Sequence, residues 1–128
     1  MPLMSADEYK ASLRDGRNVY YRGVKVEDVT AHPIIGVAVD HAATDYRMAH
    51  DPEERSLAVV EEPDGPYSRY YHIPRSAEDL LRRSALIERT TALGGTLVVL
   101  IKEIGTDALF SLNLIASHMD RTMGTAYL

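Results

Sequence analysis

The most apolar part of the chain lies between Gly94 and Gly124. Five of its apolar side chains recur at steps of four, three, four and four residues, the spacing of one stripe on an α-helix: Ala108, Leu112, Ile115, Met119 and Met123. Thr106 is suited to cap such a helix, an acid at Asp107 complements its dipole, and Gly124 is suited to end it. We expect this block to be buried on most sides. The apolar run that precedes it, residues 96–101, is too short for its pattern to distinguish a helix from a central strand.

The elements upstream of this block are expected to cover it, and two serines mark where helices begin. Ser5 and Glu8 have the spacing of a capping box and predict a short helix over residues 6–14. Ser76 and Asp79 have the same spacing and begin the clearest helix of the chain. Acid–base pairs one turn apart are expected to support that helix, namely Glu78–Arg82 and Asp79–Arg83.

Residues 18–26, NVYYRGVKV, are typical of a β-hairpin. With a two-residue Arg-Gly loop, the cross-strand pairs are Tyr21 with Val24 and Val19 with Val26. Arg22 needs a positive φ in such a loop, so a longer loop is the alternative. An isolated hairpin is marginally stable in water, and we therefore expect this one to lie on helices.

Pro33 is suited to the first position of a helix that extends to about residue 49, with His32 capping or packing at its start. The apolar stripe of this helix consists of Ile35, Val39, Ala42 and Tyr46. Residues 51–68 are acidic and rich in turn residues, and we interpret them as a surface excursion. Residues 69–73 are expected to form a short extended piece.

Length and composition limit the class of protein. The chain has 128 residues, 45% of them hydrophobic and 26% charged, which is typical of one globular domain. A net charge of −5 argues against a nucleic-acid partner, because phosphate binding needs a dense basic face. No apolar run is long enough to cross a bilayer, and the chain has no cysteine to form disulfides or ligate metals. We expect a cytoplasmic protein that binds neither nucleic acid nor membrane.

Histidine and tyrosine supply two further candidate sites. His41 and Asp45 lie one helical turn apart, and His118 precedes Asp120, but a zinc site needs three or four ligands. We therefore expect no metal, and we interpret His41 and Asp45 as part of an exposed helix face. The Tyr-Tyr-His sequence at residues 70–72 could line a flavin or an aromatic substrate. Alternation on an edge strand gives the same sequence and is the preferred interpretation.

Three stretches of the chain together resemble one family. They are EYKASLRDGRNVYYRGVKVEDVTAHP, HIPRSAEDLLRRSALIER and GTDALFSL…MDRTMGTAY. In this order they are similar to the N-terminal domain of the 4-hydroxyphenylacetate 3-monooxygenase family, which also contains 4-hydroxybutyryl-CoA dehydratase. The resemblance extends from about residue 5 to residue 127, and its first stretch is long and specific.

The resemblance implies a mainly α-helical domain of the acyl-CoA-dehydrogenase-like type, with one small β-hairpin near residues 18–26. In such enzymes a helical N-terminal domain, a β-barrel and a C-terminal helical domain enclose a flavin and a substrate. Residues 1–128 are then a single helical domain, expected to be a fragment or small subunit of a larger three-domain enzyme. The resemblance also favours a helix for residues 96–101.

The same resemblance implies ligands and partners for the complete enzyme. The cofactor implied is FAD or FADH2, bound mostly by the other domains, and the substrate is an aromatic or acyl-CoA small molecule. The implied partner is either a second copy of the chain, in a homo-oligomer, or a barrel-containing partner chain.

The chain departs from the family at the residues of both known chemistries. The dehydratases hold an iron–sulfur cluster partly with two cysteines, and the aligned positions here are Val99 and Glu103, so no cluster is expected. The aromatic hydroxylases carry an Arg and a Tyr that contact the phenol in a G-R-[ST]-P-D-Y segment, where this chain has only G-T-D-A from Gly105. We therefore assign no catalytic residue with this resemblance.

Four polar residues lie where the resemblance places the substrate pocket: Lys102, Glu103, Thr106 and Asp107. A carboxyl group in an apolar pocket has a raised pKa and can act as a general acid or base. The preferred interpretation is a helix end, with Asp107 in the first turn and Lys102 and Glu103 as solvated charges.

Three functions are carried forward from the sequence. The first is a domain of a flavin-dependent 4-hydroxyphenylacetate 3-monooxygenase-like enzyme that forms part of the substrate pocket and the oligomer interface. The second is a 4-hydroxybutyryl-CoA dehydratase-like domain that lacks the iron–sulfur ligands. The third is a non-catalytic helical association module.

Overall fold

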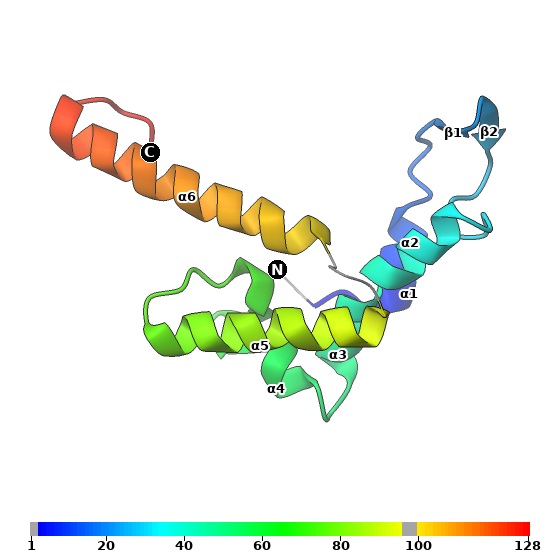
Figure 1. The fold of residues 1–128 in the computed structure, drawn as a ribbon, viewed down its shortest axis with the longest axis horizontal. Coiled ribbons are helices and arrows are strands. Elements are labelled where there is room, and N and C mark those ends of the chain that lie inside the picture. The colour runs from blue at the N-terminus through cyan, green and yellow to red at the C-terminus, as the bar shows by residue number, and fades with distance from the viewer. Residues whose placement is uncertain (1–2, 96–99) are drawn as a thin grey trace.

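A computed structural model describes residues 3–95 and 100–128. The described chain is mainly helical and has two small antiparallel hairpins (Figure 1). In chain order the elements are α1 (Ala6–Ser12), β1 (Val19–Tyr21), β2 (Val24–Val26), α2 (Ile35–Ala42), α3 (Thr44–His50), α4 (Arg55–Ala58), β3 (Val59–Glu62), β4 (Gly65–Ser68), the 3₁₀ helix η1 (Arg69–Tyr71), α5 (Ala77–Gly94) and α6 (Leu100–Met123). The predicted mainly α fold with a hairpin near residues 18–26 is confirmed, and the second hairpin is an addition to it.

Helix α1 begins at the predicted capping box. Ser5 Oγ accepts the backbone N–H of Glu8 at 3.2 Å, and a Glu8 carboxylate oxygen accepts the backbone N–H of Ser5 at 2.7 Å. The helix ends at Ser12, two residues earlier than predicted. It packs on α3 through the rings of Tyr9 and Tyr46, which stack with their centroids 4.5 Å apart. This contact places α1 beside the cavity described below.

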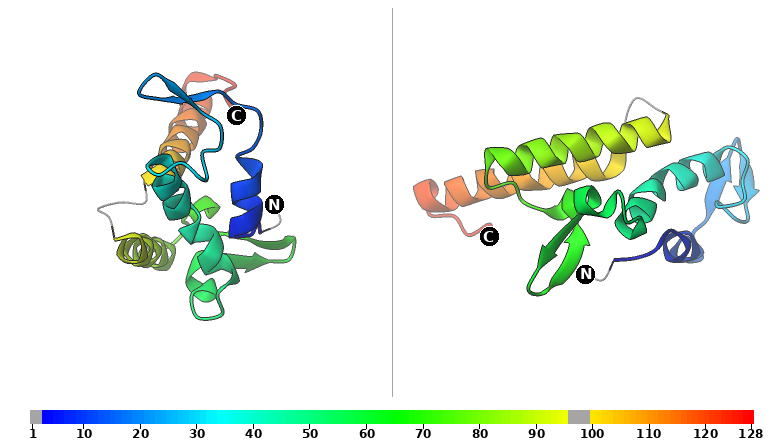
Figure 2. Two further views of the ribbon diagram at one scale, coloured as in Figure 1. Left: turned by 90° about the vertical axis from the view of Figure 1, so that its right-hand side faces the viewer. Right: turned by 90° about the horizontal axis from the view of Figure 1, so that it is seen from below.

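The β1–β2 hairpin has the predicted register. Its pairs include Tyr21 with Val24 and Val19 with Val26, and Arg22 takes the positive φ, 51°, that the two-residue loop requires. The hairpin lies at the opposite end of the molecule from the C-terminal end of α6 (Figure 2). Of its side chains, that of Val26 is buried, whereas Val24 is exposed.

Two helices occupy the segment where one was predicted over residues 33–49. His32 Nδ1 accepts the backbone N–H groups at the start of α2, so His32 caps the helix as expected, although the helix begins at Ile35. The segment then bends between α2 and α3. The guanidinium of Arg47 donates to the carbonyl of Asp40 at 2.9 Å, and this carbonyl lies near the end of α2. A side chain thus stabilises the bend, which the helical spacing does not reveal.

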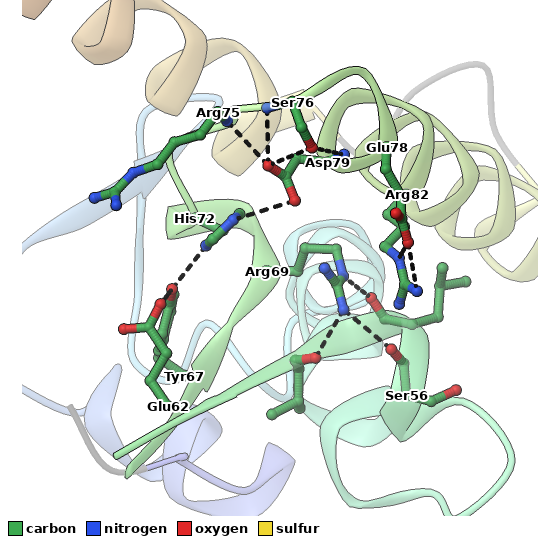
Figure 3. Close-up of polar contacts among 12 residues, drawn as sticks. Ser56, Glu62, Tyr67, Arg69, His72, Arg75, Ser76, Glu78, Asp79 and Arg82 are labelled. Carbon is green, nitrogen blue, oxygen red and sulfur yellow. Dashed lines mark hydrogen bonds and ion pairs between the residues drawn. The ribbon is translucent and has the colours of Figure 1, made fainter. Parts of the chain in front are cut away.

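The interpretation of residues 51–68 as a surface excursion is wrong, because they contain α4 and the β3–β4 hairpin. The guanidinium of Arg69 donates to three backbone carbonyls of this segment, those of Ser56, Leu57 and Val59. Figure 3 shows the Arg69 side chain directed at this turn of the chain. These bonds hold residue 69 in the 3₁₀ helix η1, so the extended piece expected at residues 69–73 and the edge strand expected at residues 70–72 are also wrong.

Helices α5 and α6 run in opposite directions along one side of the molecule (Figures 1 and 2). The capping box of Ser76 and Asp79 begins α5 as predicted. Thr106 is not a cap, because α6 is already helical at Leu100 and Thr106 donates to the carbonyl of Lys102, one turn earlier, at 2.6 Å. Residues 96–99 of the undecided run lie outside the described residues.

The core lies where α3, α4, β3, η1 and α5 meet. Its buried side chains are Met48, Ala49, Ala58, Val59, Tyr70 and Leu86. The predicted stripe of α6 is not part of it, since Leu112 is 62% exposed and Ile115 is 57% exposed. The expectation that this helix is buried on most sides is therefore wrong for the chain by itself. In the described residues, none of the helices is long and apolar enough to span a membrane.

Candidate functional site

The first turns of α6 carry Lys102, whose side chain reaches α3. Lys102 Nζ lies 3.3 Å from a carboxylate oxygen of Asp45. It also lies 3.9 Å from the centre of the Tyr46 ring, close enough for a cation–π interaction. Both charged side chains are removed from solvent, with 19% of the Lys102 side chain and 5% of the Asp45 side chain exposed. The pair therefore joins two elements that lie far apart in the sequence.

The contact with Lys102 provides a partner for only one of the two carboxylate oxygens of Asp45. Its second carboxylate oxygen, Oδ1, is buried and has no hydrogen-bond partner in the part of the chain that the structure describes. Burial raises the pKa of Asp45, and the positive charge of Lys102 opposes that rise. The interpretation of Asp45 as a residue on an exposed helix face is wrong. A buried carboxylate with a free oxygen is costly for stability and is typical of functional positions.

A cavity of about 530 Å³ opens beside this pair. Asp45, Tyr46 and Ala49 line it from α3, and Lys102 lines it from α6. Leu3 and Met4 of the N-terminal segment and Tyr67, Ser68 and Tyr71 of β4 and η1 complete its wall. The cavity therefore combines aromatic and aliphatic surface with a few polar groups, the usual composition of a small-molecule site.

A second polar cluster forms around Arg83 of α5. Its guanidinium donates to the carbonyls of Tyr70 and Glu103, to Thr106 Oγ1 at 2.7 Å and to the Asp107 carboxylate at 2.7 Å. Only 7% of the Arg83 side chain is exposed, whereas 60% of the Asp107 side chain is exposed. The predicted pair of Asp79 and Arg83 does not form. Arg83 instead ties η1 and α6 to α5.

The Glu103 side chain lies on the buried side of α6, beside Tyr70 and Thr90. The Tyr70 hydroxyl lies 2.9 Å from Thr90 Oγ1 and donates to the Glu103 carboxylate at 3.5 Å. Burial is the main cause that raises the pKa of Glu103, and the negative charge of Asp45 adds to it. The interpretation of Lys102 and Glu103 as solvated charges at a helix end is therefore wrong.

A third polar cluster is a row of titratable side chains that extends from the β3–β4 hairpin to the start of α5 (Figure 3). The Tyr67 hydroxyl donates to the Glu62 carboxylate at 2.8 Å and lies 2.7 Å from His72 Nδ1. Burial is the main cause that raises the pKa of Tyr67 to about 12, and the bond to Glu62 contributes. On the other side of the ring, His72 Nε2 lies 3.6 Å from Asp79. Of this row of side chains, Tyr67 also lines the cavity.

The four residues predicted for the site thus divide between two clusters. Lys102 faces the cavity with Asp45, whereas Glu103, Thr106 and Asp107 gather at Arg83. No group of three or more potential metal ligands occurs in the described residues.

Several buried partners of these residues are not expected from the sequence. Their spacing from apolar residues of the same helix indicates the helix face on which they lie, but it does not identify their partners. Arg83 and Thr90 flank buried Leu86 at steps of three and four on α5. Asp45 lies three residues before buried Met48 on α3.

Sequence comparison relates the chain to aromatic monooxygenases. Residues 5–127 match a family described as 4-hydroxyphenylacetate 3-hydroxylase, N terminal. The chain is 40% identical over 88 residues to the oxygenase component of 4-nitrophenol 2-monooxygenase from Rhodococcus sp, a match that covers 66% of this chain and 17% of the relative. It is 34% identical over 89 residues to the oxygenase component of 4-hydroxyphenylacetate 3-monooxygenase from Klebsiella oxytoca, with the same two coverages of 66% and 17%. The chain therefore spans roughly a sixth of the length of these relatives.

Two solved structures are similar in fold. The oxygenase component of 4-hydroxyphenylacetate 3-monooxygenase complexed with FAD superposes with a TM-score of 0.63 at 32% identity, over 69% of this chain and 19% of that one. An archaeal 4-hydroxybutyryl-CoA dehydratase from N. maritimus superposes with a TM-score of 0.82 at 30% identity, over 97% of this chain and 25% of that one. Because the family match extends over almost the whole sequence, the chain belongs to the 4-hydroxyphenylacetate 3-hydroxylase family, as its N-terminal domain.

Proposed function

We propose that this chain is the N-terminal domain of a flavin-dependent monooxygenase-like oxygenase that acts on a phenolic substrate. The observation that carries the proposal is the family match over residues 5–127. Relatives named as oxygenase components of 4-nitrophenol and 4-hydroxyphenylacetate monooxygenases, at 34–40% identity, support the same class of reaction. In this proposal the domain supplies one wall of the substrate pocket.

The substrate-pocket residues that we propose are on the first turns of α6. Lys102 is directed at the cavity, where its ammonium group could orient a phenolic oxygen. Asp107 is bound to Arg83 but is mostly exposed, so its carboxylate is accessible to a substrate between α6 and another part of the enzyme. Glu103 and Thr106 are buried on the Arg83 side of α6. They would act by holding Lys102 and Asp107 in position.

Neither the cavity beside α3 nor the groove along α6 fits FAD by itself. A pyrophosphate requires cationic side chains or free backbone N–H groups. Lys102 is the cation at the cavity and is already paired with Asp45. Another groove, along α6, is lined by apolar residues and Asn113 and offers no charge. We therefore propose that the flavin is held by other parts of the oxygenase.

We further propose that those other parts cover the exposed face of α6. Leu112 and Ile115 are mostly exposed, and they line an apolar groove of about 600 Å³ with other residues of α6 and with Ile73, Tyr127 and Leu128. A monomeric protein rarely exposes a large contiguous apolar surface. The matched relatives are several times longer than this chain, so they contain the polypeptide that such a face needs. A homo-oligomer of this chain alone is the competing outcome, which light scattering of the purified chain distinguishes.

A chimera tests the monooxygenase proposal. Residues 5–127 would replace the N-terminal domain of the 4-hydroxyphenylacetate 3-monooxygenase oxygenase component from Thermus thermophilus, which is 39% identical to this chain over 66 residues. We expect the folded chimera to bind FAD and to hydroxylate a phenolic substrate when supplied with reduced flavin. The Lys102→Met chimera is the matched control and should keep FAD binding but lose most of the turnover. A chimera that folds and binds FAD yet hydroxylates none of a panel of phenols would contradict the proposal.

The dehydratase relationship is the second candidate, because the N. maritimus dehydratase matches 97% of the chain with the higher TM-score. The chain contains no cysteine and so supplies no thiolate to an iron–sulfur cluster. Placing residues 5–127 in that dehydratase should therefore abolish cluster binding. Retention of the cluster and of dehydration would favour this candidate over the monooxygenase.

A further inference from the structure

The hydrogen bonds of Tyr67 determine which nitrogen of His72 carries a proton. The Tyr67 hydroxyl has one hydrogen, and it donates that hydrogen to the Glu62 carboxylate at 2.8 Å. The Tyr67 oxygen also lies 2.7 Å from His72 Nδ1, so this second contact needs a hydrogen that comes from the ring. His72 Nδ1 is therefore an N–H donor, and the Tyr67 oxygen is its acceptor (Figure 3).

The other ring nitrogen of His72 faces a carboxylate. His72 Nε2 lies 3.6 Å from Asp79 Oδ1. The second oxygen of Asp79 accepts the backbone N–H groups of Arg75 and Ser76, each at 3.0 Å, and the Ser76 hydroxyl at 2.9 Å. The bond from Arg75 is the main cause that lowers the pKa of Asp79, so this carboxyl group is ionised at neutral pH. A bare Nε2 would place two acceptors against each other, whereas an N–H group there suits the carboxylate.

A neutral imidazole cannot supply both contacts, because it has one N–H group and one acceptor nitrogen. With the proton on Nδ1 alone, the ring keeps Tyr67 and loses its favourable contact with Asp79. With the proton on Nε2 alone, the ring keeps Asp79 but must accept the Tyr67 hydrogen, which then leaves Glu62. The imidazolium has two N–H groups, and it is the form that completes the row of side chains from Glu62 to Asp79.

The charges around the imidazole come from β3, η1 and the start of α5. Glu62 and Asp79 are acidic and favour a positive ring, and Tyr67 stays neutral because burial is the main cause that raises its pKa to about 12. The basic groups are Arg69 and Arg75. The Arg69 guanidinium donates to backbone carbonyls, and Figure 3 shows the Arg75 side chain extending away from the ring. Only 20% of the histidine side chain is exposed, so water screens these charges little.

We propose that protonated His72 is a positioning residue that links Tyr67, and with it one wall of the cavity beside α3, to Asp79 at the start of α5. Histidine changes charge between about pH 5 and pH 8. Loss of the second ring proton as pH rises through this range breaks one of the two links and loosens the β3–β4 hairpin. The inference concerns the position of Tyr67 in this chain, so it holds for any ligand of the cavity and does not depend on the monooxygenase proposal.

NMR of the full chain tests the protonation state of His72. The ¹⁵N signals of the ring distinguish the imidazolium from each neutral tautomer. In a titration between about pH 5 and pH 8, we expect His72 to be the imidazolium at the acidic end. The ring signals of Tyr67 should then shift with the same midpoint as His72. His118, an exposed histidine on α6, is the reference in the same spectra. An uncharged His72 at the acidic end, or Tyr67 signals that do not follow its titration, would overturn the proposal.

Hydrogen exchange of the β3–β4 amides measures the link itself. After correction for the intrinsic exchange rates, we expect protection of these amides to fall by about two- to fivefold as His72 loses its proton, as the loss of a partly exposed ion pair predicts. His72→Gln cannot change charge and should abolish this pH dependence, whereas the matched control His118→Gln should keep it. If His72→Gln does not fold, Tyr67→Phe removes the acceptor of Nδ1–H and should abolish the pH dependence while His72 still titrates. Protection that is constant through the titration of wild type, or a pH dependence that persists in His72→Gln or Tyr67→Phe, would contradict the link.

Discussion

The first half of α6 buries polar side chains, whereas the second half exposes apolar ones. In the first half, Glu103 and Thr106 are buried, and the buried Arg83 of α5 binds them. In the second half, Leu112, Ile115 and neighbouring apolar residues are exposed. Arg83 of α5 bonds to η1 and to the start of α6, whereas the C-terminal half of α6 extends beyond the other helices (Figure 1).

This difference shows that polarity alone does not decide burial. A polar side chain can be buried when each of its groups has a partner, and the arginine supplies several donors in one rigid fork. An apolar side chain remains exposed when the chain provides nothing to cover it. The polar face of the first half of α6 is therefore satisfied within this chain, and the second half is a surface that another part of an enzyme could cover. Four measurements distinguish the halves.

The largest effect is expected for Arg83→Met. The substitution keeps much of the aliphatic volume but removes the donors to Tyr70, Glu103, Thr106 and Asp107. We expect the free energy of unfolding to fall by about 3 kcal/mol, because several buried acceptors lose their partner. Chemical denaturation measures it. Arg82→Met is the matched control, since Arg82 makes an exposed pair with Glu78, and it should cost less than about 0.5 kcal/mol.

A smaller loss is expected for Thr90→Val, which keeps the shape of the side chain and removes one hydroxyl. Thr90 is fully buried, and its Oγ1 lies 2.9 Å from the Tyr70 hydroxyl. The free energy of unfolding should fall by about 1–2 kcal/mol. Thr122→Val is the control, because that hydroxyl bonds only a helix carbonyl at the exposed end of α6, and it should change stability little. Equal losses of stability in the two variants would contradict a buried hydrogen bond between Thr90 and Tyr70.

The pH dependence of stability should report Glu103. Because the pKa of Glu103 is raised above its ordinary value of 4.5 in the folded protein, the folded state holds the proton more tightly than the unfolded state. The stability from this proton is fully present below the unfolded pKa and is lost as pH rises through the folded pKa. Wild type should therefore gain stability relative to Glu103→Gln as pH falls from 7 toward 4.5. A difference that is constant with pH would contradict burial of this carboxyl.

Asp15→Asn supplies a comparison of opposite sign for that measurement. Its hydrogen bonds with Arg17 lower the pKa of Asp15 to about 2. The contribution of Asp15 is thus present above pH 4 and is lost as pH falls toward 2. Unfolding curves of the two variants between pH 2 and pH 7 should diverge from wild type in opposite directions.

The smallest effect on stability is expected for the double substitution Leu112→Gln and Ile115→Gln. Both side chains are more than half exposed, so the free energy of unfolding should change by less than about 0.5 kcal/mol. Self-association should decrease, because the exposed apolar surface shrinks. Sedimentation velocity measures association. A loss of several kcal/mol would mean that this half of α6 is packed within the chain after all.

Local signals in the sequence specify much of the fold. The two capping boxes, the β1–β2 register and the helix stop at Gly124 are all confirmed. Each depends on residues that lie within a few positions of one another, so the sequence contains the complete interaction. The partner of Lys102 is Asp45, which lies 57 positions away in the sequence, so this contact does not follow from spacing.

The extent of α6 and long-range side-chain contacts explain the failures. Thr106 resembles a helix cap in sequence, and only the helix that precedes it makes it an interior residue. The sequence of residues 51–68 is typical of a polar surface loop. In the structure, however, the Arg69 guanidinium donates to three of their backbone carbonyls and stabilises the β3–β4 hairpin and the 3₁₀ helix η1. Such bonds join groups whose distance in space does not follow from their spacing in sequence.

The sequence by itself determined the family, the mainly helical class, the starts of α1 and α5 and one hairpin, because propensity, capping and turn chemistry act locally. Tertiary structure alone decided which groups the buried polar residues contact. Arg83, Glu103 and Asp45 are of residue types that usually lie on the surface. They are buried here because the packing of α3, α5, η1 and α6 places hydrogen-bond or ion-pair partners beside them. Burial depends on what packs against a residue, and that partner is set by the whole fold.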